Sequence, residues 1–420
     1  MTRFLCKIIA LLALILNTST LLGDLFVYVM NYSDGTVSVI DTETSAVVAT
    51  IPIGVSSRHI SVSPDGQTVL AGNPTGGEVA VIDAASNTES SRFPTTSGSF
   101  GMDYTSDGAF VYVVQNPTDN VGVYETSGYT LVSTIPVGDN PFNITIAPNG
   151  QFAYVTDQTS DTVTVINTTN NTVTTTISGG GLDGPFEVVF RPDGAFAYVD
   201  NGVGGGLTVI DTSSHGIVTT VPVPNGASPR GIAILPDGSK VYVMTPGGGG
   251  YINIFDTATN TFSDSFAYPP SHDIVINSTG TLAYVSDILG DSINILDLST
   301  NTQINSIPVG NSPREMAISP LPQTESVIGD IDITGKCDKD SFLTETEIFA
   351  KISWSTPKDG AIASRYFIYR NAQLIKTIAE NDSRVFVDHN LKRKEHYTYV
   401  IIAENETGII ARGSFELKCN

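Results

Sequence analysis

The sequence predicts an all-β protein in which a seven-bladed β-propeller precedes a smaller β-sandwich. A two-part motif, a Tyr-Val pair followed about twelve residues later by Ile-Asp, occurs seven times with a period of 42 or 44 residues. Turn residues divide each repeat into four short strands, and no segment after residue 24 has a helical period. Because one repeat cannot bury both faces of its own sheet, seven repeats predict a closed ring of blades.

The motif gives the positions of the second and third strands of each blade. The Tyr-Val position is occupied by Tyr28, Leu70, Tyr112, Tyr154, Tyr198, Tyr242 and Tyr284. The Ile-Asp position is occupied by Ile40-Asp41, Ile82-Asp83, Tyr124-Glu125, Ile166-Asn167, Ile210-Asp211, Phe255-Asp256 and Leu296-Asp297. The acids that follow a third strand can accept hydrogen bonds from backbone N–H groups two residues on, so we interpret them as structural.

The first strand of each blade carries alternating apolar residues with small residues between them, as in 230–235. This pattern suits the strand nearest a crowded axis, and Asp237-Gly238 supplies the tight turn that follows. The chain enters the ring at a second strand, from Phe26, and ends with a lone first strand, 314–319. We therefore expect the last strand to complete the first blade, with the propeller spanning residues 25–320.

Two stretches carry a family resemblance. Residues 228–243 read Ser-Pro-Arg-Gly-Ile-Ala-Ile-Leu-Pro-Asp-Gly-Ser-Lys-Val-Tyr-Val, and residues 35–42 read Gly-Thr-Val-Ser-Val-Ile-Asp-Thr. Both resemble the YVTN-type β-propeller repeat family. The resemblance implies the seven-bladed fold but little about activity, since the family includes surface-layer and envelope proteins as well as relatives of lactonases and lyases.

The composition changes after residue 320. Residues 321–344 are expected to be a linker and the entry into a sandwich domain, and residues 345–420 alternate as short strands do. Trp354-Ser-Thr-Pro, and Leu391 with Tyr397 six residues later, resemble a fibronectin type III sandwich. The resemblance implies that Trp354 is a core residue and Tyr397 the corner tyrosine, although Arg393 stands where that family usually has proline.

The first 23 residues predict an export signal. Arg3 and Lys7 accompany an unbroken apolar run, Ile8–Leu16, that is too short to span a bilayer. The protein is therefore expected to be periplasmic, at the cell surface or secreted, with no membrane span after signal removal; the alternative is an uncleaved membrane anchor. In an oxidising compartment, Cys337 and Cys419 are expected to form a disulfide.

The charge excludes two classes of partner. The chain has a net charge of −22, and between residues 25 and 320 there are 27 acidic residues and 6 basic ones. Such a field repels nucleic acid and anionic membrane, so neither is an expected partner. Because no metal-ligand spacing occurs and no glycine run is followed by a helix or by Lys-Ser/Thr, no metal or other cofactor is predicted.

One face of the ring is free of the Asp turns, and it holds the openings of the first strands around the channel mouth. Four consecutive blades have a cationic or imidazole residue there, and three have phenylalanine. In ring order these residues are Arg230, His272, Arg314, Arg58, Phe100, Phe142 and Phe186. The next positions add His59, Asn143, Glu187, Asp273 and Glu315.

This arrangement predicts a mouth with an anion-binding side and an aromatic side, suited to a protein, a glycan or a small anionic or amphipathic ligand. A lactonase- or lyase-like enzyme would need a base or a divalent metal there, and the candidates are His59, His272, Glu187, Asp273 and Glu315. Because none recurs with ligand spacing, we favour a binding or scaffolding protein with no catalytic residue assigned. Two alternatives stay open: such an enzyme, and a structural surface protein without a specific ligand.

Overall fold

In the computed structural model of the chain, the described residues are 26–54, 57, 59–225, 228–319, 329–330, 333–341, 346–355, 365–370, 373–379, 384–389, 391, 396–405 and 408–418. They form β-strands, turns and two short 3-10 helices, Asn116–Thr118 and Gly247–Gly249, and contain no α-helix. The chain divides into two compact units between residues 321 and 322. The predicted export signal, residues 1–23, lies outside the described residues. Within them, no helix is long and apolar enough to cross a membrane.

The first unit contains seven four-stranded antiparallel sheets, here called blades 1 to 7. Blade 1 contains β28 (Pro313–Ile318), β1 (Phe26–Asn31), β2 (Thr36–Asp41) and β3 (Ala46–Pro52); blade 2 contains β4 (Ile60–Val62), β5 (Thr68–Asn73), β6 (Glu78–Asp83) and β7 (Thr88–Pro94). Blade 3 contains β8 (Ser99–Tyr104), β9 (Phe110–Gln115), β10 (Asn120–Glu125) and β11 (Thr130–Pro136); blade 4 contains β12 (Pro141–Ile146), β13 (Phe152–Asp157), β14 (Thr162–Asn167) and β15 (Thr172–Ser178).

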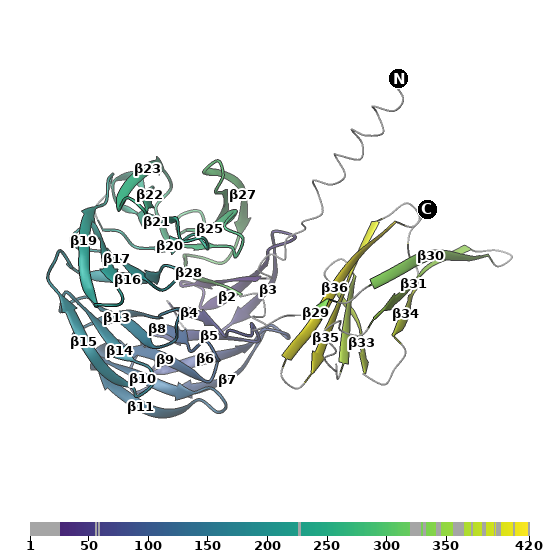
Figure 1. Cartoon of the computed structure of the whole chain (residues 1–420), viewed down its shortest axis with the longest axis horizontal. Coiled ribbons are helices and arrows are strands. Elements are labelled where there is room, and N and C mark those ends of the chain that lie inside the picture. The colour runs from purple at the N-terminus through teal and green to yellow at the C-terminus, as the bar shows by residue number, and fades with distance from the viewer. Residues whose placement is uncertain are drawn as a thin grey trace, which may run out of the picture. The chain divides into compact units, whose positions relative to one another are not determined.

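The other three blades follow the same order. Blade 5 contains β16 (Pro185–Phe190), β17 (Phe196–Asn201), β18 (Gly206–Asp211) and β19 (Gly216–Pro222); blade 6 contains β20 (Ile232–Ile234), β21 (Lys240–Thr245), β22 (Tyr251–Asp256) and β23 (Thr261–Ala267); blade 7 contains β24 (Ser271–Ile276), β25 (Leu282–Asp287), β26 (Ser292–Asp297) and β27 (Thr302–Pro308). Figure 1 shows β4, β8, β16 and β28 near the centre of the ring and β11, β15 and β19 at its rim. The all-β, seven-bladed prediction is confirmed.

The core lies between neighbouring blades. Each of the seven Tyr-Val positions has a second-strand side chain that is at most 1% exposed. One cluster, for example, joins Tyr28 and Val39 of blade 1 to Val69 and Ile82 of blade 2. Both faces of each sheet are therefore covered by apolar side chains, which explains why the second and third strands read as nearly continuous hydrophobic runs.

Blade 1 is closed by the two ends of the propeller sequence, as predicted. Strand β28 pairs antiparallel with β1, with Tyr28 opposite Ala317, and the Phe26 N–H donates to Ser319 Oγ at 3.0 Å. The turn acids have the predicted structural role: Asp211 Oδ1 accepts hydrogen bonds from the backbone N–H groups of Ser213 and Ser214, each at 3.0 Å.

The second unit contains two sheets. One has the order β29 (Gly329–Asp330), β36 (Gly408–Lys418), β35 (His396–Asn405), β32 (Arg365–Arg370) and β33 (Gln373–Ala379); the other has the order β30 (Ile333–Ser341), β31 (Thr346–Trp354) and β34 (Val385–Asp388). Side chains from both sheets share one hydrophobic cluster, in which the Trp354 ring centroid lies 5.7 Å from that of Tyr366.

Strand β30 was missed by the sequence analysis, because it lies in the segment expected to be a linker. Its residues are mostly polar and show no apolar alternation, yet it pairs with β31 along its whole length. The predicted disulfide lies outside the described residues, since Cys419 and the side chain of Cys337 are not among them.

Candidate functional site

The residues that open the first strands lie together in the channel. The ring centroids of Phe142 and Phe186 are 3.9 Å apart, and His59 lies 5.5 Å from Phe100 and 4.9 Å from Phe142. Phe186 also lies 6.3 Å from His272. His59 and Phe142 belong to blades 2 and 4, and Phe186 and His272 belong to blades 5 and 7, so these contacts bypass an intervening blade.

Two glycines permit these contacts. A Cβ atom on Gly101 would lie 2.6 Å from Asn143 Cα, and one on Gly231 would lie 2.8 Å from the His272 carbonyl oxygen. Blades 3 and 6 therefore leave space at these positions, and the backbones of the following blades approach closely. The glycines occupy the repeat position that carries His59 and Glu187 elsewhere.

The aromatic side of the mouth is a buried plug and not an open wall. Phe142 is 4% exposed, Phe186 6% and His59 2%, whereas Phe100 is half-buried. Contacts among these rings contribute to their burial. The expected amphipathic mouth therefore offers a ligand less apolar surface than the sequence pattern implied.

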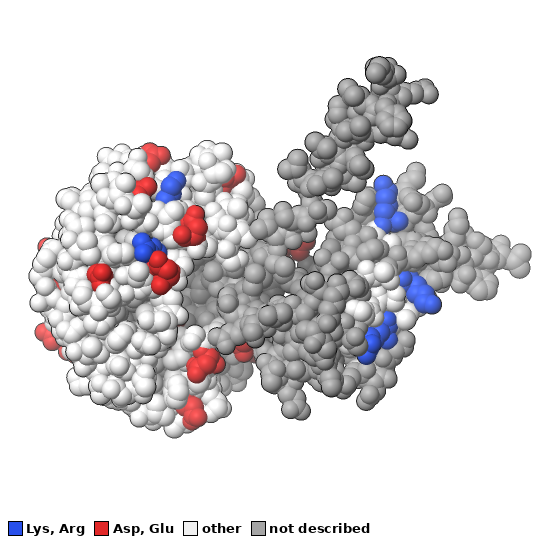
Figure 2. Space-filling view, viewed as in Figure 1, with Lys and Arg blue, Asp and Glu red and all other residues white. Residues whose placement is uncertain are grey.

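One of the predicted arginines contacts this plug. Arg230 is exposed, and its guanidinium lies 5.2 Å from the Phe186 ring centroid. The guanidinium of Arg314 lies 4.3 Å from the ring centroid of Tyr32. The predicted Arg58 lies outside the described residues. Figure 2 shows how sparse Lys and Arg are beside Asp and Glu on the propeller face in view.

The predicted carboxylates at this level join neighbouring blades. Glu187 Oε2 accepts a hydrogen bond from the Ile232 N–H at 3.2 Å, and Asp273 Oδ2 accepts one from the Met316 N–H at 2.7 Å. Both N–H groups belong to the innermost strand of the next blade. The acids thus satisfy backbone donors at an inner sheet edge, which would otherwise be buried without partners.

Two further acids have the same role and were missed. Asp103 Oδ2 accepts from the Ile146 N–H at 2.7 Å, while Asp200 accepts from the N–H groups of Glu187 at 2.6 Å and Gly231 at 3.2 Å. A signal for Asp103 existed: a charged residue stands where other first strands have a small or apolar one, such as Ala233.

Burial sets the protonation of this cluster. It raises the pKa of Asp103, Asp200 and Asp273 to about 7 each, even though each accepts hydrogen bonds that favour its ionised form. Burial raises the pKa of Glu187 well above its usual range, and the charges of Asp273 and Asp200 raise it further. The channel therefore holds protons at neutral pH that exposed carboxyl groups would release.

His59 and Glu315 form a buried pair between blade 2 and the closing strand of blade 1. His59 Nδ1 lies 2.8 Å from Glu315 Oε2. Among the described residues, His59 Nε2 and Glu315 Oε1 have no hydrogen-bond partner. A carboxylate that orients an imidazole is an arrangement found in general bases, although His59 is only 2% exposed. Within the described part of the chain, no three His, Cys, Asp or Glu residues are arranged to hold a metal ion.

Comparison with known proteins supports the fold. A family model described as "Lactonase, 7-bladed beta-propeller" matches residues 68–179, and one described as "Cytochrome D1 heme domain" matches residues 17–100. Each match covers less than half of the chain. No curated protein matches.

Solved structures with the same architecture are distant in sequence. Hydrazine synthase of Kuenenia stuttgartiensis is 23% identical with a TM-score of 0.56, covering 61% of this chain and 87% of that one. A functionally unknown protein from Desulfotomaculum acetoxidans DSM 771 is 21% identical with a TM-score of 0.62, covering 70% and 98%. A putative 6-phosphogluconolactonase from Bacteroides fragilis NCTC 9343 is 17% identical with a TM-score of 0.59, covering 72% and 99%. At these identities the similarity shows the fold alone.

Proposed function

We propose that this chain is an exported binding or scaffolding protein of the YVTN type, whose propeller mouth binds the anionic group of a protein, a glycan or a small ligand. The observation that carries the proposal is the exposed Arg230 guanidinium above the Phe186 ring. In this proposal the second unit is a fibronectin type III-like sandwich, which supports attachment or spacing at the cell envelope or outside it.

The chemistry of the mouth favours an anion at the rim. An arginine stacked on an aromatic ring is held in one orientation, and its N–H groups match carboxylate and phosphate oxygens. Arginine is rare in this unit: 6 basic residues serve residues 25–320, and Arg230 and Arg314 open equivalent strands of blades 6 and 1. Phe142 and Phe186 are almost fully buried, so the ligand is expected to contact the arginines and not these rings.

Calorimetric titration with hexanoate tests the proposal, with neutral hexanamide as the uncharged probe. Arg230→Ala should weaken hexanoate binding about tenfold, since one charge-assisted contact is lost. Arg191→Ala is the matched control, because its guanidinium also lies over a phenylalanine ring, that of Phe196 at 4.6 Å, beside a turn acid. We expect that control to change the affinity by about twofold at most. Equal losses in the two variants, or no hexanoate binding at all, would reject the anion site.

A second candidate function rests on the His59–Glu315 pair together with the lactonase family match over residues 68–179. A lactonase- or lyase-like enzyme would use His59 as its base, with Glu315 fixing the imidazole orientation. Turnover of a lactone panel by the wild type that is abolished in His59→Gln would replace the binding proposal with this one. The third possibility is a structural surface protein without a ligand. It predicts that Arg230→Ala changes neither hexanoate binding nor lactone turnover.

A further inference from the structure

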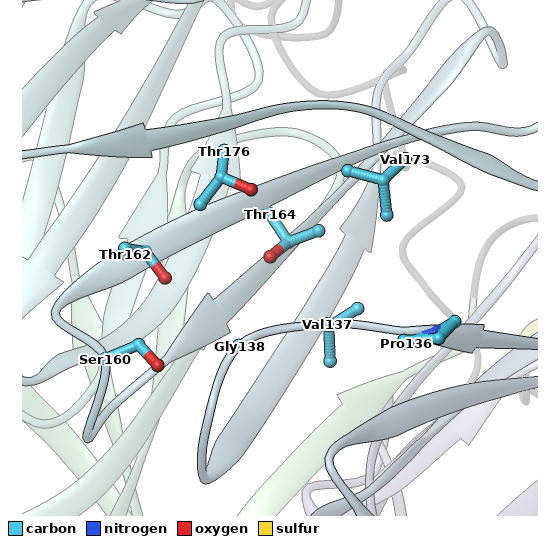
Figure 3. Close-up of a pocket in the computed structure, with 8 residues that line it drawn as sticks. All are labelled: Pro136, Val137, Gly138, Ser160, Thr162, Thr164, Val173 and Thr176. Atoms are coloured by element: carbon cyan, nitrogen blue, oxygen red, sulfur yellow. The ribbon is translucent and has the colours of Figure 1, made fainter.

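A hydroxyl-lined groove lies between blades 3 and 4, away from the innermost strands. Its volume is about 260 Å³, just below the range of about 300–1,000 Å³ that is usual for ligand sites in proteins. Figure 3 shows Pro136, Val137 and Gly138 of the segment that ends β11 on one side, and side chains of blade 4 on the other. The residues of blade 4 are Ser160, Thr162, Thr164, Val173 and Thr176.

A buried carboxylate stands behind two of these hydroxyls. Asp157, at the end of β13, has no exposed surface, and its Oδ2 accepts hydrogen bonds from Thr162 Oγ1 at 2.9 Å and Thr164 Oγ1 at 2.7 Å. Its Oδ1 has no partner among the described residues. Gly138 packs directly on this side chain, since a Cβ atom there would lie 2.7 Å from Asp157 Cγ.

The direction of these hydrogen bonds limits what Thr162 and Thr164 can bind. A hydroxyl group has one hydrogen and two lone pairs, and Thr162 and Thr164 each donate that hydrogen to Asp157. Toward the groove, both hydroxyls can therefore only accept. A ligand that contacts them must bring donors of its own.

Blades 1 and 5 have the opposite polarity at the same repeat position. Asn31 Nδ2 donates to Ser38 Oγ at 2.8 Å in blade 1, and Asn201 Nδ2 donates to Thr208 Oγ1 at 2.9 Å in blade 5. In those blades the hydroxyl keeps its hydrogen for another acceptor; Thr208 pairs with Thr220 at 2.8 Å. The aspartate in blade 4 thus reverses a contact that asparagine makes elsewhere in the fold.

The charge around the groove favours a cation. Residues 93–190, which include blades 3 and 4, contain no Lys, Arg or His, and Asp161 stands between the lining residues Ser160 and Thr162. Burial raises the pKa of Asp157 to about 6, so its carboxyl group is ionised at about pH 8. No Lys, Arg or His within this segment neutralises that carboxylate. The apolar side chains of Pro136, Val137 and Val173 can cover a short hydrocarbon chain.

We propose that this groove binds a small organic primary ammonium compound, with Thr162 and Thr164 accepting from the ammonium group and Asp157 supplying the charge. The site is separate from the arginine rim and independent of the function proposed for it. Its ligand is opposite in charge to the one expected there.

Ligand-observed NMR titrations at about pH 8, in a buffer without amines, test the proposal. The probes are butylammonium, 1-butanol and butyrate, which share one hydrocarbon chain. The wild type should bind butylammonium and neither of the others. Asp157→Asn should weaken that binding about tenfold or more, because the charge is lost and the two hydroxyls can turn their hydrogens into the groove.

Asp157→Asn should fold normally, because asparagine occupies the equivalent position in blades 1 and 5. Unchanged circular dichroism and thermal unfolding verify this. Asp139→Asn is the matched control: it removes an exposed acid from the adjoining loop and should change the affinity by about twofold at most. Absence of butylammonium binding, equal effects of the two variants, or equally tight binding of 1-butanol would each overturn the proposal.

Discussion

Acidic residues on the turn face and in the channel of this propeller make similar hydrogen bonds and have opposite protonation behaviour. On the turn face, Asp211 is only partly buried, and its hydrogen bonds from the Ser213 and Ser214 hydroxyl and N–H groups lower its pKa. In the channel, Asp273 also accepts from backbone N–H groups, those of Ile274 and Met316, yet burial raises its pKa to about 7. At Asp273, desolvation therefore outweighs hydrogen bonding.

The comparison teaches that the two faces tolerate change differently. The turn face is specified by local chemistry that each turn supplies to itself. In the channel, acids such as Glu187 and Asp273 accept hydrogen bonds from the adjacent blade, and Gly101 and Gly231 leave room for its backbone. A substitution there should act on an interface between blades, whereas one on the turn face should act on a single turn.

The largest expected effect comes from adding one methyl group in each region. Gly101→Ala would place Cβ 2.6 Å from the backbone of Asn143, and backbone cannot move as a side chain can. We expect a loss of about 2–3 kcal/mol in the free energy of unfolding. On the turn face, a Cβ atom at Gly128 would meet only Thr130 Oγ1, at 3.8 Å. Gly128→Ala should therefore change the free energy of unfolding by less than about 0.5 kcal/mol. Urea denaturation measures both; similar losses would contradict the distinction between the faces.

A smaller effect is expected from neutralising a channel acid. Because the folded-state pKa of Asp273 is raised to about 7 from an ordinary value near 4, its ionisation costs the native state stability as the pH rises through that window. Asp273→Asn keeps an oxygen acceptor for the Met316 N–H and removes the charge. We expect it to stabilise the protein by on the order of 1–2 kcal/mol at about pH 8 and to have little effect at about pH 4. A destabilised variant at both pH values would show that the carboxylate itself is required.

The smallest effect, with the opposite sign, is expected for Asp211→Asn on the turn face. The pKa of Asp211 is lowered in the folded state, so its contribution to stability is present above its unfolded-state pKa and is lost as the pH falls. The variant should therefore be slightly less stable than the wild type near neutral pH, with the difference vanishing in acid. Thermal unfolding across a pH series measures this, and a stabilised variant at neutral pH would remove the contrast with Asp273.

Much of the fold could be predicted from the sequence because repeats carry their own register. The spacing of Tyr28 and its equivalents determines the number of blades, and the order of the strands at each end of the ring requires closure through β28. Strand β30 escaped because a polar edge strand has no apolar alternation to detect. The structural role of the turn acids, such as Asp211, could also be predicted, because such an acid accepts hydrogen bonds from residues of its own turn.

The site could be predicted less completely. Alternation indicates which residues open the first strands, and the structure does bring His59, Phe142 and Phe186 together. The alternation does not reveal that Phe142 and Phe186 are buried against each other, because that depends on the space left at Gly101 and Gly231. The groove in front of Asp157 could not be predicted from the sequence either, because the direction of a hydroxyl hydrogen bond depends on contacts between adjacent strands.

The closure of blade 1 has a consequence for the time course of folding. The hydrogen bond from Phe26 to Ser319 joins residues 293 positions apart, so β1 is synthesised long before β28, the inner strand that pairs with it. Contacts so distant in sequence slow folding, because the ends of a long loop must meet before any bond between them forms. The unpaired edge of β1 is exposed for as long as that search lasts. An early-arriving β28 peptide, supplied in trans, should compete for this edge during refolding.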